Sequence, residues 1–323
     1  MLSRVANSIY WMCRYMERAE SYARLIDANQ RLILDLPADV PEQWNPIVET
    51  TGDQQRFTEQ HEEFDKDSVF QFMGLDRENP NSIVSSLSYA RENARTIREV
   101  ISSEMWFHIN QVYWEVQKGL AAETYRGNLS SGLIPIVKSA SQSFAGIMDS
   151  TMSHGTAWLF GTMGRFLERS DQTARILDIK YYYLLPSVDH VNSPLDLLQW
   201  SALLKSAGAM EMYLKQFGTV NFDEIVSFLA LDKNFPRSIL HCLKTAEGCL
   251  HEITGSSSPY STPPERELGR LRSRLEYMDI VEIKTMGLHE FIDWFQLNSN
   301  RISESIFDQF FAQNKKAVAE TSQ

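Results

Sequence analysis

Apolar residues recur at three- and four-residue spacing along most of this chain, the pattern of helices with one side buried. No run of alternating β-branched residues interrupts this pattern, so we predict an all-α protein. Pro and Gly cluster between the periodic segments, where they favour turns. The predicted helices cover residues 3–35, about 79–118, 131–152, 154–185, 195–216, 235–254 and 264–313, and the predicted breaks cover 37–46, 79–80, 127–135, 186–194 and 255–264.

Two blocks of the sequence occur twice, in the same order. Residues 14–27 match residues 165–178 at a constant offset of 151, with Arg, Glu-Arg, Arg and Asp at the same places. Residues 43–83 match residues 199–239 at an offset of 156. We therefore predict a duplicated multi-helix bundle, in which two pseudo-symmetric repeats share one core within a single domain. The predicted boundaries are 1–323 for the domain and 1–152 and 153–323 for the repeats.

The first pair of matched segments carries its charges on one side of a helical wheel and apolar residues on the other. Both copies use Arg at every basic position of the pattern. The charged positions are Arg14, Glu17, Glu20, Arg24 and Asp27 in the first copy and Arg165, Glu168, Asp171, Arg175 and Asp178 in the second, with Arg18 and Arg169 completing each Glu-Arg pair.

The simplest interpretation of these charges is a ladder of ion pairs along each helix. In the first copy Arg14–Glu17 and Arg24–Asp27 are three residues apart, and Glu20–Arg24 are four apart. Each such pair contributes only ~0.2–0.5 kcal/mol when exposed. The consistent use of Arg instead favours planar guanidinium groups that bind buried or bidentate partners.

We therefore favour a buried network that locks the two copies together. The alternative is a ligand or partner site in which the arginines hold a carboxylate or phosphate, while Glu17 and Glu168 orient them or accept a proton. An incidental charged surface is the third interpretation.

A second charged segment, residues 90–99, places Arg91, Arg95 and Arg98 on one helical stripe beside Glu92. Three like charges on a stripe are destabilising unless anions meet them. We expect Glu17 and its neighbours to do so from a packed helix, with a bound ligand as the alternative. The tryptophans that we expect to anchor the core are Trp44, Trp106 and Trp200.

The composition and the lack of certain sequence patterns argue against several classes of partner and site. The net charge of −11 and the lack of a Lys/Arg stripe argue against nucleic acid. No stretch reaches the ~18 apolar residues that cross a bilayer, and the N-terminal residues lack the apolar core of a signal peptide. Three cysteines without a C-x-x-C pair argue against a disulfide framework or a zinc site. We therefore expect a cytoplasmic protein without a membrane partner.

Recognised catalytic motifs are missing from the sequence. It has no P-loop, G-x-G-x-x-G, G-x-S-x-G or H-E-x-x-H pattern. The pairs Glu104/His108 and Glu247/His251 lack the Glu-x-x-His spacing of a di-iron bundle. The acidic run around His61 is better explained as a solvated loop or helix start than as a cation site. We therefore predict no metal and no cofactor.

Four segments, 15–20, 90–95, 103–106 and 166–171, resemble the bacterial alpha-E family, a helical domain named for its Glu-Arg motif. The likeness runs from about residue 1 to 310. The motif residues that carry over are Glu17, Arg18, Arg91, Glu92, Arg95, Glu168 and Arg169, to which the family assigns no role.

The resemblance implies a functional setting rather than a reaction. Members of this family are typically encoded beside a circularly permuted ATP-grasp ligase and a transglutaminase-like peptidase, and sometimes fused to them. We therefore expect an accessory, scaffold or substrate-binding subunit of an ATP-grasp-linked peptide or amide ligation system. The alternative is an enzyme that acts on a peptide or carboxylate through the Glu-Arg motif residues.

Overall fold

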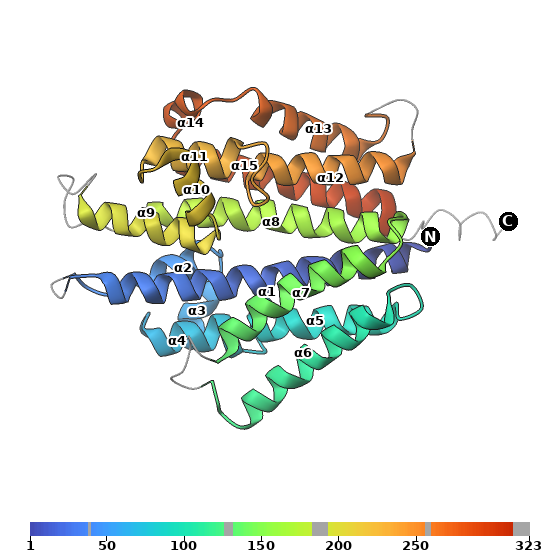
Figure 1. Cartoon of the computed structure of the whole chain (residues 1–323), viewed down its shortest axis with the longest axis horizontal. Helices are drawn as coiled ribbons and strands as arrows, with labels where there is room; N and C mark the ends of the chain where they lie inside the picture. Colours follow the sequence, from blue (N-terminus) through green and yellow to red (C-terminus); the bar gives the residue numbers. More distant parts are fainter. Residues whose placement is uncertain (38–39, 126–131, 183–192, 256–259, 313–323) are drawn as a thin grey trace.

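The computed structural model describes residues 1–37, 40–125, 132–182, 193–255 and 260–312 (Figure 1). These residues form helices and turns and contain no strand, so the all-α prediction is confirmed. The helices are α1 (Ser3–Asp35), α2 (Asn45–Glu49), α3 (Gln54–Gln60), α4 (Lys66–Phe70), α5 (Ile83–Thr96), α6 (Ser103–Ala121), α7 (Leu133–Thr151), α8 (Thr156–Tyr182), α9 (Pro194–Ser206), α10 (Met210–Phe217), α11 (Phe222–Leu231), α12 (Ile239–Thr254), α13 (Pro263–Glu276), α14 (Ile280–Met286) and α15 (Leu288–Ile306), with the π-helical turns η1 (Gln71–Leu75) and η3 (Phe307–Phe311).

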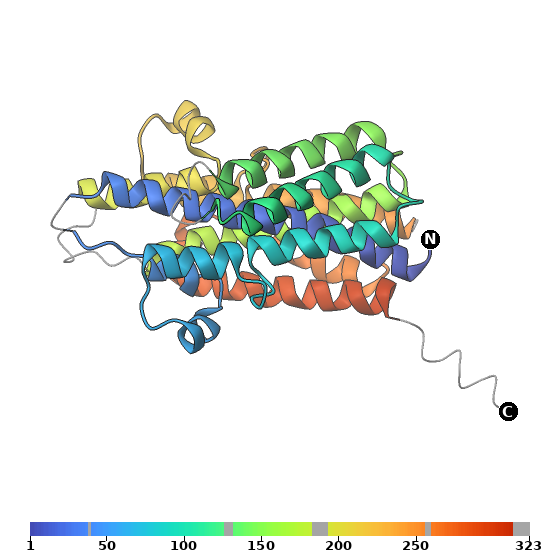
Figure 2. The ribbon, with the colours of Figure 1, turned by 90° about the horizontal axis from the view of Figure 1, so that it is seen from below.

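Two long helices, α1 and α8, lie side by side through the centre of the molecule (Figures 1 and 2). Helix α1 packs against α5, α7 and α9, and α8 packs against α12, α15 and α2. The outer helix α6 rests on α5 and α7, and α13 rests on α12 and α15. Buried apolar side chains from both halves of the chain form one continuous core cluster around the α1–α8 pair.

Glycines allow α1 and α8 to approach closely. A Cβ atom on Gly164 would lie 2.6 Å from the backbone oxygen of Tyr10, closer than two such atoms can pack. One turn earlier, a Cβ atom on Gly161 would meet the ends of the Met148 and Cys13 side chains at 2.7 and 2.9 Å. The backbone of α1 therefore lies directly against α8 at Gly164.

Three predicted helices are interrupted in the structure. The predicted helix 79–118 divides into α5 and α6, because the Ser102 side chain accepts a hydrogen bond from the backbone N–H of Met105 and begins a new helix. The predicted helix 195–216 breaks at Gly208, whose φ is +60° and whose Cα faces the Arg24 guanidinium. The predicted helix 264–313 breaks where Asp279 caps α14, and again at Gly287, with φ +95°.

Short helices also occupy two segments where no helix was predicted, 45–75 and 222–231. They are too short for periodicity to identify them. Part of the acidic run around His61 is a helix start, as expected, because the Asp65 side chain accepts from the backbone N–H groups of Asp67 and Ser68 at the beginning of α4. The predicted breaks within 127–131, 186–192 and 256–259 lie outside the described residues.

Candidate functional site

The charged positions of α1 and α8 face each other across the helix pair. The Arg169 guanidinium donates two hydrogen bonds to the two carboxylate oxygens of Glu17, each 2.7 Å long. In the matching contact, Arg18 donates to the two oxygens of Glu168 at 2.6 and 3.1 Å. Each Glu-Arg pair of one helix is therefore bound by that of the other, and the favoured interpretation of a buried interhelix network is the one that the geometry supports.

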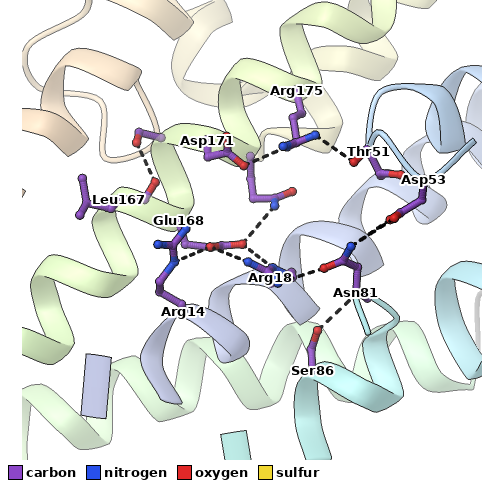
Figure 3. Close-up of polar contacts among 12 residues, drawn as sticks. Arg14, Arg18, Thr51, Asp53, Asn81, Ser86, Leu167, Glu168, Asp171 and Arg175 are labelled. Carbon is purple, nitrogen blue, oxygen red and sulfur yellow. Dashed lines mark hydrogen bonds and ion pairs between the residues drawn. The ribbon is translucent and has the colours of Figure 1, made fainter. Parts of the chain in front are cut away.

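Glu168 is fully buried between two arginines of α1 (Figure 3). Besides Arg18, it accepts from Nε of Arg14 at 2.7 Å and from the Gln172 amide at 3.2 Å. Arg14 also donates to the Tyr10 hydroxyl at 2.9 Å. Burial alone raises the pKa of Glu168, but Arg18 and Arg14 outweigh it and hold the pKa at about 2. Glu168 is ionised at neutral pH, with both oxygens occupied.

Glu17 is buried in the same way on the other side of the helix pair, with an exposed fraction of 1%. Its second arginine is Arg237, which donates at 2.9 Å and also reaches Glu20 at 2.7 Å. Burial raises the pKa of Glu17, whereas Arg169 and Arg237 lower it more strongly, to about 2. Arg237 comes from the turn before α12, so this cluster joins three segments that are far apart in the sequence.

The two clusters differ in one arginine. Arg165 occupies the place in α8 that Arg14 occupies in α1, yet among the described residues it forms no ion pair, and its buried Nε atom has no hydrogen-bond partner. Burial and then the neighbouring Arg169 lower the pKa of Arg165. The second arginine that binds Glu17 is Arg237 instead.

Further along α1 and α8, a third arginine of each matched segment pairs within its own helix. Arg24 donates to Glu20 at 2.7 Å, as predicted. Arg175 donates to Asp171 at 2.8 Å and to the carbonyl oxygen of Thr51 at 3.0 Å (Figure 3). It also donates to the carbonyl oxygen of Thr50 at 3.0 Å. The Arg175 contacts hold the end of α2 against α8.

Two of the pairs in the ladder interpretation, which we did not favour, do not form within the described residues. Arg14 pairs with Glu168 rather than with Glu17, and Arg24 pairs with Glu20 rather than with Asp27. Glu168 lies on the facing helix, where it binds Arg14 together with Arg18, whereas Glu20 lies one turn before Arg24 on the same helix.

The aspartates at the ends of the two matched segments belong to other contacts. Asp27 binds Arg31 and Lys138 at 3.1 and 2.9 Å. Asp178 accepts from Nδ1 of His289 at 2.7 Å, and burial raises the pKa of Asp178. The structure therefore places neither aspartate among the buried Glu-Arg contacts.

The second charged segment lies apart from this network. Arg91 and Arg95 both bind Glu92, on their own helix, and Arg91 also donates to Asn110 at 2.9 Å. The expectation that Glu17 neutralises this stripe is therefore wrong, because Glu17 is already enclosed by Arg169 and Arg237 on the α8 side.

Aromatic rings of α6 complete the surroundings of these arginines. Arg91 lies 4.6 Å from the ring centre of Tyr113, and Arg98 lies 4.8 Å from that of Trp106. Trp106 is only half-buried, so its side chain lies partly in the core and partly at this surface. Trp44 and Trp200 are buried in the core, as predicted.

Polar contacts lead from Glu168 towards the surface. Arg18 donates to the Asn81 side chain at 3.1 Å, and Asn81 donates to both oxygens of Asp53, at 3.3 and 3.1 Å (Figure 3). Asp53 lines an open depression of about 610 Å³, together with Gly52, Gln55, Arg56, Glu59, Gln60 and Glu78.

Sequence reasoning missed Arg237, Asn81 and Asp53 as parts of the network. For two of these residues the sequence held a clue, because Asn81 and Arg237 occupy matching places after Pro80 and Pro236 in the second repeated block. The match shows that the turn before α5 and the turn before α12 occupy equivalent positions in the sequence, but not that both turns reach the Glu-Arg contacts.

The chemistry open to this network is limited. Glu17 and Glu168 accept two or more hydrogen bonds each and are enclosed, so neither is a ready proton acceptor.

Burial raises the pKa of Cys13, Cys242 and Cys249 to about 12, which removes thiolate character at neutral pH. Within the described residues, no group of three His, Cys, Asp or Glu side chains could hold a metal ion. No helix in the same residues has the length and apolar character that spanning a bilayer requires.

Comparison with known proteins gives one family and a few distant relatives. Residues 1–311 match the model of a family described as a predicted alpha-helical domain with a conserved ER motif. Proteins of Mycobacterium bovis and Mycobacterium tuberculosis, each named as uncharacterized, are 23% identical over 320 residues, and a further M. tuberculosis protein is 22% identical. The match covers 88% of this chain but only 34% of each relative, so the chain spans about a third of their length. No solved structure matches this chain.

Proposed function

This chain belongs to the alpha-E family, and we propose that it is an accessory helical scaffold of an ATP-grasp-linked system that forms peptide or amide bonds. Its partners in this proposal are an ATP-grasp ligase and a transglutaminase-like peptidase, and its place of action is the cytoplasm. The Glu-Arg motif holds the scaffold together and performs no chemistry. The chain offers its partners a rigid surface built on the α1–α8 pair.

The observation that carries this proposal is the mutual enclosure of the motif. Glu168 has no exposed surface and is bound by Arg14 and Arg18, and Glu17 is bound by Arg169 and Arg237. Charges that satisfy each other in the interior contribute little net stability, but they fix which faces of the two helices meet. A catalytic carboxylate would instead need access to a substrate.

We also propose that the chain is a duplication with a pseudo-twofold axis between α1 and α8. Support comes from the order and the spacing of the helices. Helices α10, α11, α12 and α15 begin 155 or 156 residues after α3, α4, α5 and α7. The packing partners correspond as well, since α1 contacts α5 and α7 while α8 contacts α12 and α15. In this proposal, repeats 1–152 and 153–323 form one domain.

The length of the relatives supports an accessory role. About two thirds of each mycobacterial relative lies outside the matched region, so the helical domain there is joined to further polypeptide. In those relatives the matched region and the additional polypeptide lie in one chain, and in this proposal the present chain also works beside further protein.

The test combines the purified chain with the ATP-grasp ligase that this proposal makes its partner. We expect the two to co-elute, ATP consumption by the ligase to rise in the presence of the chain, and the chain alone to consume none. ATP turnover by the chain alone would overturn the proposal. So would a ligase that neither binds the chain nor changes its rate when the chain is added.

The second candidate is an enzyme that acts on a peptide or carboxylate through the motif. The observation in its favour is the polar row from Glu168 through Arg18 and Asn81 to Asp53 at the surface depression. This candidate predicts that Glu168→Gln abolishes turnover and leaves the melting temperature unchanged. The scaffold proposal predicts the opposite, a lower melting temperature.

A further inference from the structure

Helix α6 is the outermost helix on its side of the molecule (Figure 1). Seen from that side, α6 lies between α7 and α5 and contacts both (Figure 2). Its inward residues Met105, Ile109, Val112 and Val116 are buried. The residues on the opposite side of α6 face outward.

The outward side of α6 carries a regular stripe. Glu104, Phe107, Gln111, Trp114 and Lys118 follow one another at intervals of three, four, three and four residues, and all five are exposed. On a helix advancing about 100° per residue, they fall within an arc of about 80°. Spacing of this kind is the pattern by which one helix packs along another.

Two large aromatic side chains dominate this stripe. Phe107 is 68% exposed and Trp114 is 50% exposed. The Trp114 ring is held in place by the edge of Tyr113, at 5.3 Å between ring centres, and by the Arg91 guanidinium, at 5.6 Å. A fixed aromatic ring loses little conformational entropy on binding, which is the property of an interface anchor.

The fold itself does not require aromatic residues at this place. Helix α13 rests on α12 and α15 as α6 rests on α5 and α7. The exposed residues of α13 include Arg266, Arg270 and Arg274, which are charged. An aromatic stripe on α6 therefore needs an explanation of its own, and a partner surface provides one.

The order of residues on the stripe is self-complementary. Reading from either end gives a charge, an aromatic ring, Gln111, an aromatic ring and a charge, and the two terminal charges have opposite signs. When two copies of α6 lie antiparallel and cross near Gln111, Phe107 of one copy meets Trp114 of the other. In the same arrangement Glu104 meets Lys118, and neither of them forms an ion pair within the described part of its own chain.

We propose that a second copy of this chain binds the outward stripe of α6, and that the two copies form an antiparallel dimer around a twofold axis at Gln111. Such an interface uses the same patch on both subunits, as twofold dimers do. One helix of 19 residues gives a contact of about 28 Å. Because a single helix pair buries less surface than a standard interface, the dimer has a dissociation constant on the order of micromolar.

The experiment is sedimentation equilibrium of the full chain from roughly one to several hundred micromolar, a range that brackets such an affinity. Wild type is expected to pass from monomer to dimer. The double variant Phe107→Ala/Trp114→Ala is expected to weaken association at least about tenfold. A matched control is Tyr277→Ala, which removes an aromatic ring that is 82% exposed at the end of α13. This control is expected to associate like wild type.

Charge reversal tests the antiparallel arrangement separately. E104K and K118E each place like charges opposite each other at two symmetric positions, so each is expected to weaken association several-fold. The combined variant E104K/K118E is expected to restore it, and all variants should melt like wild type because these side chains are exposed. Wild type that stays monomeric throughout would overturn the proposal. An unchanged single reversal, or a combined variant that fails to recover, would overturn the antiparallel pairing.

Discussion

The Glu17 carboxylate and the Arg169 guanidinium form two hydrogen bonds of 2.7 Å between residues 152 positions apart in the chain. The same contact recurs between Arg18 and Glu168. Each motif carboxylate is bound by a guanidinium of the other helix, so neither helix alone can form these contacts. The α1–α8 pair must therefore form as a unit, and removing one charge leaves its partners buried without a counter-ion.

Glu168→Ala is expected to destabilise the protein by roughly 3–5 kcal/mol, because it leaves Arg14 and Arg18 buried without their carboxylate. Denaturant unfolding at neutral pH measures this loss. The matched control is Glu92→Ala, which removes a carboxylate that also binds two arginines, but on the surface. The control should change the free energy of unfolding by no more than about 1 kcal/mol. Equal losses for the two variants would show that the buried network does not hold α1 to α8.

Acid is expected to weaken the fold between about pH 4.5 and pH 2. The folded-state pKa values of Glu17 and Glu168 are about 2, below the 4.5 of an unperturbed glutamate. A group whose pKa is depressed by folding stabilises the protein fully above its unfolded pKa and loses that contribution as the pH falls through its folded pKa. Unfolding free energies measured from pH 7 down to pH 2 should therefore decline in that window. A curve for Glu168→Gln should decline less steeply than that of wild type.

Gly164→Ala is expected to lower the melting temperature, because the added methyl group would clash with the backbone oxygen of Tyr10. A backbone atom, unlike the end of a side chain, cannot move away by a rotamer change. Overpacking of this kind costs about 1–3 kcal/mol. Gly161→Ala should cost less, since the atoms it meets are the ends of the Met148 and Cys13 side chains. The control is Gly146→Ala on α7, where an added Cβ meets nothing within 4 Å. This variant should be neutral or stabilising by up to about 1 kcal/mol, and calorimetry of all three checks the order.

The three thiols are expected to resist a water-soluble disulfide reagent under native conditions. Cys13, Cys242 and Cys249 are buried, and their pKa values of about 12 leave almost no thiolate at pH 8. Titration in denaturant should release all three within the mixing time of the reagent. Rapid labelling of the native protein by even one equivalent would contradict the burial of these residues.

The helical nature of the chain followed from periodicity alone, and α1 begins and ends where the sequence predicted it. The pattern was less informative where a single residue turns the chain. Ser102 begins a new helix, and Gly208 breaks one, within stretches whose periodicity otherwise continues. Their effects depend on a cap and on the closeness of Arg24, neither of which a hydrophobic pattern records.

The amino-acid sequence was enough to establish that this chain is helical, that two of its segments match, and that arginines and glutamates repeat in register. Those properties are local, because each depends on spacing along one helix. The three-dimensional arrangement was needed to show that Glu168 binds Arg14 and Arg18 across the helix pair, that Arg165 forms no ion pair within the described residues, and that Arg91 belongs to the surface. The physical reason is that a charged side chain has several acceptable partners along its own helix. Burial against a facing helix then selects the partners that together satisfy both oxygens of a carboxylate away from water.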